Sequence, residues 1–573
     1  MSSRASFDAA DHDLPDGLSL RPALLKRHAP QGTVLRRLAR ALATPDCLAI
    51  LTIVALVAVV FATFRDYGLG WDDYTHSQMG DLVLSLYGSG FRDQRALSFV
   101  NLYYYGSGPD ILAALAAKVL PFDLFETRRL VDALIGVVGI IAAWRIARRV
   151  AGPRAGLVAA LLLATCPIYF GHMFINAKDA PFAAAMTVLL LGIVRLFEEY
   201  PKPSPTTVLL FGCGLGAAIG TRVIAVITVI PVALALVLLL YLDTRRATLR
   251  AALVRLGRFA VSVLPGLALA YLVMGLLWPW SIVSPLNPLR AAEYFSVFFE
   301  KPWREVFEGR LIEVPDMPAS YLPTLLSLQL PEILLALFAI GVAIAAMWTL
   351  RGALSPQRRA IALLLVASAL APIVLAIATR PAMYNGFRHF LFLLPAFAVL
   401  GGIAGAWLWE RSARLGRPAL AAVATIAAVG FISPVIEMVR LHPYEYTHFN
   451  RIEGGVKKAE NEFMLDYWGL SFKQAAQQLR ERLAEHMETP PKGRRWRIAV
   501  CGPHAPAAVE LGPEFEPTWD ISKADFALML GTYYCLQLPA PVLAQVEREG
   551  VNYARAYDVR ERSFSTLFTV PHL

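Results

Sequence analysis

The chain has 573 residues, of which 56% are apolar and only 17% are charged. Soluble proteins carry about 25% charged residues, and one water-facing core stops growing at roughly 250–300 residues. The surplus of apolar sequence therefore indicates a membrane protein and excludes an ordinary cytosolic enzyme, a fibrous protein and a disordered chain. Lys and Arg outnumber Asp and Glu by 54 to 44. Because these cations follow the membrane pattern described below, we expect no nucleic-acid partner.

Eleven apolar segments approach the length of about 20 residues that a membrane-spanning helix needs. They are residues 46–64, 130–147, 155–171, 182–197, 206–220, 223–242, 259–280, 332–350, 360–379, 389–409 and 418–436. The fifth and sixth come from one run that is interrupted by Arg222, where a charge favours the apex of a hairpin. The sequence therefore predicts an all-α polytopic membrane protein with about eleven spans.

Basic residues gather before the first span and in every second loop after it. Loops rich in Lys and Arg stay in the cytoplasm. The loop residues are Arg145, Arg148, Arg149, Arg154, Arg245, Arg246, Arg250, Arg255, Arg351, Arg358, Arg359, Arg411, Arg414 and Arg417. We therefore expect a cytoplasmic basic tail over residues 1–45, a first span that acts as a signal anchor, and an outward-facing chain end.

The spanning domain is predicted to cover residues 46–439 and to carry two long outward loops. The loop 65–129 contains patterns of helices that lie along the membrane surface, and the loop 281–331 is rich in proline and predicts an ordered loop or lid.

The outward tail, residues 440–573, predicts a small extracytoplasmic α/β domain. It has an amphipathic helix pattern followed by three short strand patterns. The helix is expected over residues 471–486 and the strands over 496–500, 526–530 and 565–570. Cys501 and Cys535 each follow a strand or its turn, and a disulfide between them is left open.

Two adjacent carboxylates, Asp72 and Asp73, begin the first outward loop. Either can cap the helix that follows. Capping needs only one acidic residue, so the second remains able to accept a proton from a bound hydroxyl. The residues alone leave open which of the two roles each one has.

Further polar groups are predicted to emerge on the same outward side. His172, Asn176, Lys178 and Asp179 lie within ten residues between the third and fourth spans. Asp179 is a fair helix start, whereas Lys178 could hold a phosphate as a point charge.

Two more cationic positions, Arg222 and Arg388 with the adjacent His389, lie at outward ends of spans. Each could extend to the membrane interface, or they could gather with Lys178 around an anion. The chain has no phosphate-loop, dinucleotide or zinc-hydrolase motif, which disfavours a nucleotide-driven pump and a zinc hydrolase.

The motifs around these residues resemble the bacterial dolichyl-phosphate-mannose protein mannosyltransferase-like enzymes, a glycosyltransferase family 39-like group of the C-type (GT-C) membrane glycosyltransferase superfamily. The similarity covers residues 46 to about 475 and departs from the family where Asp73 replaces Glu and Ala177 replaces Pro. Four blocks carry it: Trp71-Asp72-Asp73, Gly171-His172 with Asn176 to Phe182, Tyr384 to Phe392, and Phe449-Asn450 with Gly454-Gly455 and Asp466 to Gly469.

The resemblance implies that a sugar moves, with inversion, from a polyprenyl-phosphate donor to an acceptor at the outer face of the bacterial inner membrane. It implies roles for three groups of residues. The catalytic group is Asp72, Asp73 and Asp179, with Asp72 as general base; the donor-phosphate group is Lys178, Arg222, Arg388 and His389; the sugar or acceptor group is His172, Asn176, Tyr384, Trp280 and Trp303.

Several alternatives stay open on sequence alone. The acceptor could be a protein, lipid A or its core, or another envelope glycan, and membrane lipid is an expected partner. Asp72 and Asp179 could share a divalent cation if the fold brings them within coordination reach. The rival functions are a transporter or flippase of lipid-linked sugars and a membrane anchor that presents the tail domain.

Overall fold

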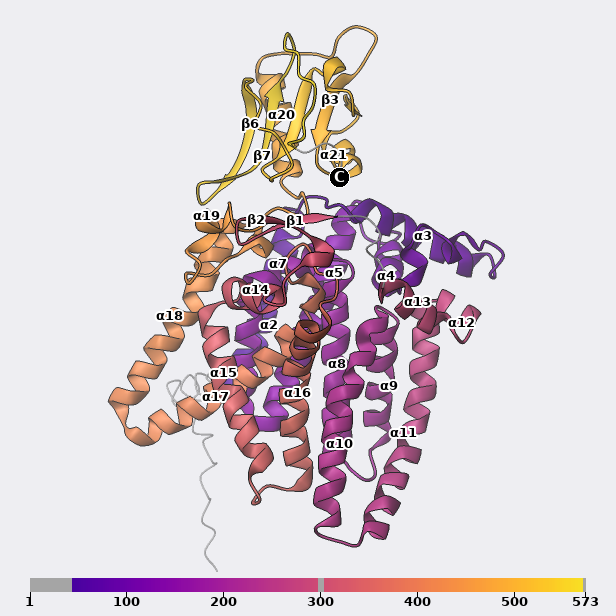
Figure 1. Ribbon diagram of the computed structural model, residues 1–573, viewed down its shortest axis with the longest axis vertical. Helices are drawn as coiled ribbons and strands as arrows, with labels where there is room; N and C mark the ends of the chain where they lie inside the picture. Colours follow the sequence, from indigo (N-terminus) through magenta and orange to yellow (C-terminus); the bar gives the residue numbers. More distant parts are fainter. Residues whose placement is uncertain (1–43, 297–302, 570–573) are drawn as a thin grey trace, which may run out of the picture.

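The computed structural model describes residues 44–296 and 303–569, so most of the predicted basic tail lies outside the described residues. Long helices run side by side and carry a small domain at one end (Figure 1). Within the described ranges, nine helical segments are long and apolar enough to span a membrane. They are α2 (Pro45–Thr63), α5 (Leu124–Ala151), α8 (Asp179–Glu198), the segment Val223–Thr244 that ends in α10 (Val229–Thr244), α11 (Leu249–Leu277), α15 (Glu332–Leu350), α16 (Pro356–Thr379), α17 (Leu393–Leu415) and α18 (Arg417–Leu441).

The two remaining predicted spans are also helical but are shorter or broken. The third is a pair, α6 (Pro153–Ala164) and α7 (Pro167–Ile175), bent by 63° at a break where a proline begins the second helix. The fifth is α9 (Pro205–Ile219), of 15 residues. Gly212 and Gly216 let α9 approach α11, because a Cβ at either position would lie 2.6 Å from a backbone oxygen of α11. The prediction of an all-helical, multi-pass membrane domain is confirmed.

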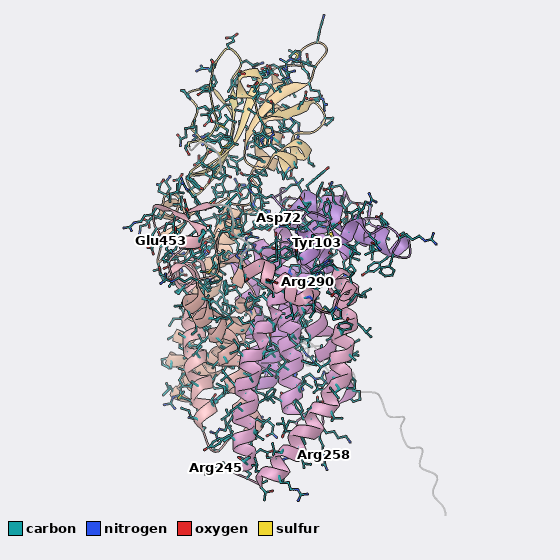
Figure 2. All side chains as sticks on the ribbon, turned by 45° about the vertical axis from the view of Figure 1, so that its right-hand side comes forward. Asp72, Tyr103, Arg245, Arg258, Arg290 and Glu453 are labelled. Atoms are coloured by element: carbon teal, nitrogen blue, oxygen red, sulfur yellow. A yellow bond between two sulfur atoms is a disulfide. The ribbon has the colours of Figure 1, made fainter. Side chains whose placement is uncertain are left out.

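Charged residues of two predicted loops mark the two ends of the helical bundle. Asp72 lies at the end that carries the small domain, whereas Arg245 and Arg258 lie at the opposite end (Figure 2). The loop predicted to be cytoplasmic and the loop predicted to face outward are therefore at opposite ends, as the positive-inside rule requires.

Both long loops contain helices, although the sequence predicts surface helices only in the first and an ordered loop or lid in the second. In the first, α3 (Asp73–Gly88) packs on α4 (Gly108–Ala116) through an apolar face that includes Val83 and Leu86. The second contains α12 (Trp280–Val283), α13 (Asn287–Ser296), α14 (Tyr321–Gln329) and an antiparallel hairpin of β1 (Arg304–Phe307) and β2 (Arg310–Glu313). Sequence analysis missed this hairpin.

The tail folds into the small domain seen above the bundle in Figure 1 and confirms the predicted α/β class. Its five-stranded sheet has the order β4-β3-β5-β7-β6. The elements are α19 (Gly455–Ala459), α20 (Phe472–Glu485), β3 (Trp496–Cys501), α21 (His504–Leu511), β4 (Phe515–Thr518), β5 (Phe526–Leu530), β6 (Val542–Arg548) and β7 (Val551–Asp558). A disulfide joins Cys501 at the end of β3 to Cys535.

One predicted strand is wrong and one hairpin was missed. Residues 565–569 form no strand; only Phe568 makes an isolated bridge, to Cys535. Strands β6 and β7 form a hairpin whose two connecting residues, Glu549 and Gly550, both have positive φ. A Gly at such a turn is a signal of a tight hairpin that the sequence reading did not use.

Candidate functional site

A cavity of about 410 Å³ lies at the outward end of the bundle, between the helices and the outward loops. Segments far apart in sequence meet in its wall. Among the residues predicted from the motifs, those that line it are Asp72, Lys178, Asp179, Arg222, Trp303, Tyr384, Arg388 and His389. The fold thus brings the first carboxylate and the predicted cations into one site.

The adjacent carboxylates Asp72 and Asp73 point to different environments. Asp73 is buried, accepts the Gly70 backbone N–H at 2.7 Å, and pairs with both terminal nitrogens of Arg129 at 2.6 and 2.7 Å. Asp72 precedes α3 but makes no side-chain capping bond, and it lines the cavity. The structure therefore places Asp73, expected to be catalytic, outside the cavity and in an ion pair.

Asp179 holds the two arginines of the cavity. Arg222 contacts one of its oxygens, and Arg388 Nη1 lies 3.5 Å from the other. Asn176 fixes the same carboxylate, donating to it at 2.9 Å and accepting the Asp179 backbone N–H at 2.8 Å. Since Arg222 and Arg388 are largely buried at this carboxylate, they do not extend to the membrane interface.

The charges around Asp72 set its protonation. Burial raises the pKa of the Asp72 carboxyl, but Lys178, Arg388, His76 and Arg222 outweigh this effect and bring the pKa below its ordinary value. Asp72 is therefore ionised at neutral pH and can accept a proton or a hydrogen bond.

The pKa values of Lys178 and His389 are also lowered, but for these basic groups burial acts in that direction. Burial lowers the pKa of the Lys178 amine to about 8, although Asp72 partly opposes this shift. Burial and the neighbouring cations hold the pKa of His389 well below its ordinary value. His389 is thus neutral, and the cations available to an anion are Lys178, Arg222 and Arg388. Lys178 Nζ also lies 3.7 Å from the centre of the Tyr105 ring.

Several polar atoms of the cavity wall are buried and have no hydrogen-bond partner within the described residues. They are Trp303 Nε1, Trp468 Nε1, Asn385 Oδ1 and Arg388 Nε. Buried polar atoms normally have partners, so such a group concentrated at one cavity indicates a site for a polar ligand. Trp468 also packs on Arg388, whose guanidinium carbon lies 4.7 Å from the ring centre.

A buried carboxylate outside the predictions, Glu305 on β1, supports the loop that carries Arg388. It accepts the Tyr321 hydroxyl at 2.7 Å and the Asn385 backbone N–H at 2.6 Å. Asn385 and Gly386 have φ of 57° and 71°, a turn that needs such external support. Burial raises the pKa of Glu305 to about 7.

Three predicted sugar-binding or acceptor-binding residues do not line the cavity. His172 and Asn176 lie behind it, where His172 Nε2 is 3.2 Å from the Tyr467 hydroxyl and His172 Nδ1 is 3.3 Å from Asn176 Nδ2. Trp280 packs against Tyr103 and Tyr104, with ring centres 5.3 and 5.1 Å away. His172 and Asn176 therefore hold side chains next to the cavity in place, and Trp280 packs within a group of aromatic side chains.

Sequence analysis also missed residues that do line the cavity, notably Tyr105 and Trp468. Trp468 stands in one of the four blocks that resemble the family, so a signal for it was present. Tyr105 ends a run of three tyrosines, which by itself indicates no ligand.

A second, smaller cavity of about 170 Å³ adjoins the first and shares Tyr105, Arg222, Tyr384 and His389 with it. The rest of its wall is apolar: Val223, Ile224, Phe295, Pro381, Ala382, Met383 and Phe390. A charged head group and an apolar chain could therefore bind side by side.

For a metal, Asp72 and Asp179 both reach the cavity, but Asp179 is occupied by two arginines. In the part of the chain that the structure describes, no group of three His, Cys, Asp or Glu side chains is placed to hold a metal ion.

Fold and cavity together define a multi-pass membrane protein with a cavity, lined by a carboxylate and three cations, at the end of the bundle that carries the small domain. A family model described as dolichyl-phosphate-mannose-protein mannosyltransferase matches residues 109–272, which include Lys178, Asp179 and Arg222. This is the family that the sequence motifs resemble. Comparison with curated proteins gives no match.

Several solved structures are similar to the chain. ArnT from Cupriavidus metallidurans in the apo state is 16% identical, with a TM-score of 0.48 and coverage of 90% of this chain and 99% of that one. ArnT bound to undecaprenyl phosphate is 15% identical with the same coverage and a TM-score of 0.48. The oligosaccharyltransferase of Archaeoglobus fulgidus is 12% identical, with a TM-score of 0.47 over 79% of this chain and 62% of that one.

Proposed function

We propose that the chain is a membrane glycosyltransferase that moves a sugar, with inversion at the anomeric carbon, from a polyprenyl-phosphate donor to an acceptor. One observation carries the proposal: an ionised carboxylate, Asp72, and three cations, Lys178, Arg222 and Arg388, share one cavity beside an apolar one. The family match over residues 109–272 supports the same reaction class.

The cations suit the donor phosphate. As the bond between the anomeric carbon and the phosphate oxygen breaks, negative charge grows on the phosphate. Lys178, Arg222 and Arg388 would stabilise that charge. Asp179 keeps both arginines in place before the donor arrives, so little reorganisation is needed during the reaction. The polyprenyl chain would enter the apolar cavity, which fixes the reactive carbon relative to Asp72.

Asp72 would act as the general base. The acceptor oxygen attacks the anomeric carbon and transfers its proton to the Asp72 carboxylate as the new bond forms. In the free protein the neighbouring cations lower the pKa of Asp72. A bound phosphate compensates those cations, so the pKa of Asp72 rises and the carboxylate becomes a stronger base only when the donor is present.

The sugar would lie between the aromatic residues of the cavity. Trp303, Trp468 and Tyr384 offer ring faces, and the unpartnered indole N–H groups together with Asn385 Oδ1 offer hydrogen bonds to sugar hydroxyls.

We further propose that the protein lies in the bacterial inner membrane, with the spanning domain over residues 46–439 and the domain 440–573 in the periplasm. The disulfide between Cys501 and Cys535 supports an oxidising compartment for the tail. The acceptor is a protein, lipid A or its core, or another envelope glycan.

The location of the cavity favours this enzyme over a transporter of lipid-linked sugars. Transporters place their ionisable sites near the middle of the membrane. Here Asp72 lies at the outward end of the bundle (Figure 2).

The test uses purified wild type and Asp72→Asn with a panel of polyprenyl-phosphate sugars and candidate acceptors, and follows released polyprenyl phosphate by mass spectrometry. We expect release that needs both Asp72 and an acceptor. If no donor turns over while lipid-linked sugar crosses proteoliposomes that contain the protein, the transporter replaces the enzyme.

A further inference from the structure

The outward domain contains a cavity of its own, of about 310 Å³. It shares no lining residue with the cavity around Asp72. Four segments form its wall: Val306 of β1, the connecting segment 460–465, the end of β5 with the loop that follows it (529–537), and β7. Its volume is at the lower end of the roughly 300–1,000 Å³ of ligand pockets.

The lining is rich in side chains that can still form hydrogen bonds. The side chains of Asn461 and Gln537 are exposed and that of Thr532 is half-buried, so all three can donate to or accept from a ligand. Asn552 Oδ1 is buried and has no hydrogen-bond partner within the described residues. Arg555 donates through Nε to Gln545 at 3.2 Å, and its terminal nitrogens have no partner in the same part of the chain. A buried amide oxygen without a partner indicates a ligand that donates to it.

Aromatic residues and two residues of opposite charge also line this cavity. Phe463, Tyr533 and Tyr557 are among the lining residues, and the two charged residues there, Arg555 and Glu460, have opposite sign. Such a wall suits a ligand with many hydroxyl groups, little net charge and a flat apolar face. A lipid chain would leave the amides and the arginine unsatisfied.

The sheet argues against a peptide as the ligand. Peptides commonly bind to a sheet by pairing with a strand whose edge is free. Three strands contribute to the wall. The backbones of β5 and β7 are already paired, since both are interior strands of the order β4-β3-β5-β7-β6, and β1 pairs with β2 on one side and bridges Phe463 through Phe307 on the other.

We propose that this cavity binds a saccharide, and that the saccharide is part of the acceptor. The hairpin β1–β2 connects it to the cavity around Asp72. Trp303, which immediately precedes β1, lines that cavity; Glu305 holds the Asn385 turn; and Val306 lines the cavity of the outward domain. The Tyr533 hydroxyl donates to the Arg304 backbone oxygen at 2.7 Å, which ties the same hairpin to the cavity loop.

Binding of the saccharide rests on the cavity alone, whereas its place in the acceptor rests on the proposed glycosyltransferase function. The experiment therefore measures binding and turnover separately. Full-length protein is placed in nanodiscs, because maltoside detergents carry a sugar head group that would compete. It is applied to an array of neutral and acidic hexose and hexosamine oligosaccharides, with a peptide array in parallel.

Five proteins are compared. Wild type, Asp72→Asn and the control Arg482→Ala, an exposed arginine of α20 outside the cavity, should bind the same glycans. Arg555→Ala removes the guanidinium, and Thr532→Trp fills the space; each should weaken the best glycan at least tenfold in a calorimetric titration. Both variants should still release polyprenyl phosphate with a minimal acceptor that lacks the glycan and therefore does not use this cavity.

The results separate the hypotheses. If no glycan binds the wild type, or if binding is lost in Asp72→Asn and kept in both cavity variants, the saccharide site is wrong. Binding of peptides instead of glycans would also overturn it. If Arg555→Ala does not fold, Thr532→Trp decides. A donor that turns over without any glycan binding refutes this site and leaves the proposed function intact. Glycan binding without donor turnover supports the site and refutes its link to an acceptor.

Discussion

The wall of the cavity around Asp72 and the layer of buried charges beside it use the same residue types in opposite ways. In the buried layer Asp73 pairs with Arg129, and Asp110 lies 2.8 Å from Arg128 and 3.0 Å from His76, whereas both carboxylate oxygens of Asp132 have no hydrogen-bond partner within the described residues. In the cavity, the Asp72 carboxylate makes no direct ion pair or hydrogen bond within the described residues, although three cations lie in the same wall. Pairing together with access to the cavity therefore distinguishes Asp73 from Asp72, although the two are neighbours in sequence.

The substitution Asp72→Asn tests most directly whether the unpaired carboxylate is the general base. The change keeps size and removes the base, so we expect acceptor-dependent release of polyprenyl phosphate to fall by about 10²–10⁴-fold, the usual contribution of general base catalysis. The melting temperature and the affinity for polyprenyl phosphate should not fall. Asp72→Glu, which retains the carboxylate, should recover part of the rate. Full activity of Asp72→Asn would remove the base from the mechanism.

Asp73→Asn should lower the stability of the protein, whereas Asp72→Asn should lower only its activity. It leaves the buried Arg129 guanidinium without its charged partner, a change that typically costs about 3–5 kcal/mol. We expect a large fall in the thermal unfolding temperature in detergent. The double variant Asp73→Asn with Arg129→Met removes both charges and should be more stable than the single variant. If Asp73→Asn instead retained wild-type stability and lost only activity, Asp73 would belong with Asp72.

The role of Lys178 can be tested through the pH dependence of the donor KM, because burial lowers the pKa of its amine to about 8. The amine is charged below this pH and neutral above it. The donor KM should therefore rise as the pH passes about 8, by up to roughly tenfold per unit, equivalent to about 1.4 kcal/mol, if donor phosphate binds only the charged form. Lys178→Arg keeps the charge at all these pH values, so its donor KM should stay flat across the same range. A wild-type KM that does not change with pH would exclude this role.

The sequence predicted the parts of this arrangement that depend on local patterns. Apolar length located the helices, the motifs selected Asp72, Lys178 and Arg388, and a charge at the end of a span selected Arg222. The orientation inferred from the arginines of alternate loops stays a prediction. What could not be predicted depends on contacts between distant segments. Asp72 and Asp73 have the same local context, and only Arg129, more than 50 residues away, decides which of them is neutralised.

The prediction of secondary structure also failed where an element depends on contacts between distant segments. The buried strand β5 was predicted within its observed bounds, whereas the β1–β2 hairpin was missed because its strands have four residues each and join the tail only through tertiary contacts such as the Phe307–Phe463 bridge. Glu305 lies on that hairpin, so no sequence pattern could associate it with Arg388, which is more than 80 residues away.

Glu305 is a paired, buried carboxylate that nevertheless acts on the cavity, and its expected effect is the smallest. Ionised Glu305 can accept from the Tyr321 hydroxyl and the Asn385 N–H at once, whereas the protonated form must donate and loses part of this support. Since burial raises its pKa to about 7, the loop that carries Arg388 should be held most firmly above pH 7. Activity should therefore increase as the pH rises through about 7.

Glu305→Gln should remove that increase and raise the donor KM several-fold, with a smaller change in kcat, because a positioning residue acts through Arg388 on phosphate binding. Tyr321→Phe gives the matched test. It deletes one hydrogen bond that stabilises the carboxylate, so the pKa of Glu305 should rise further and the midpoint of the increase should move above pH 7. If the midpoint stays unchanged in Tyr321→Phe and persists in Glu305→Gln, the titrating group is not Glu305. Glu305 would then only stabilise the structure and would not determine how activity depends on pH.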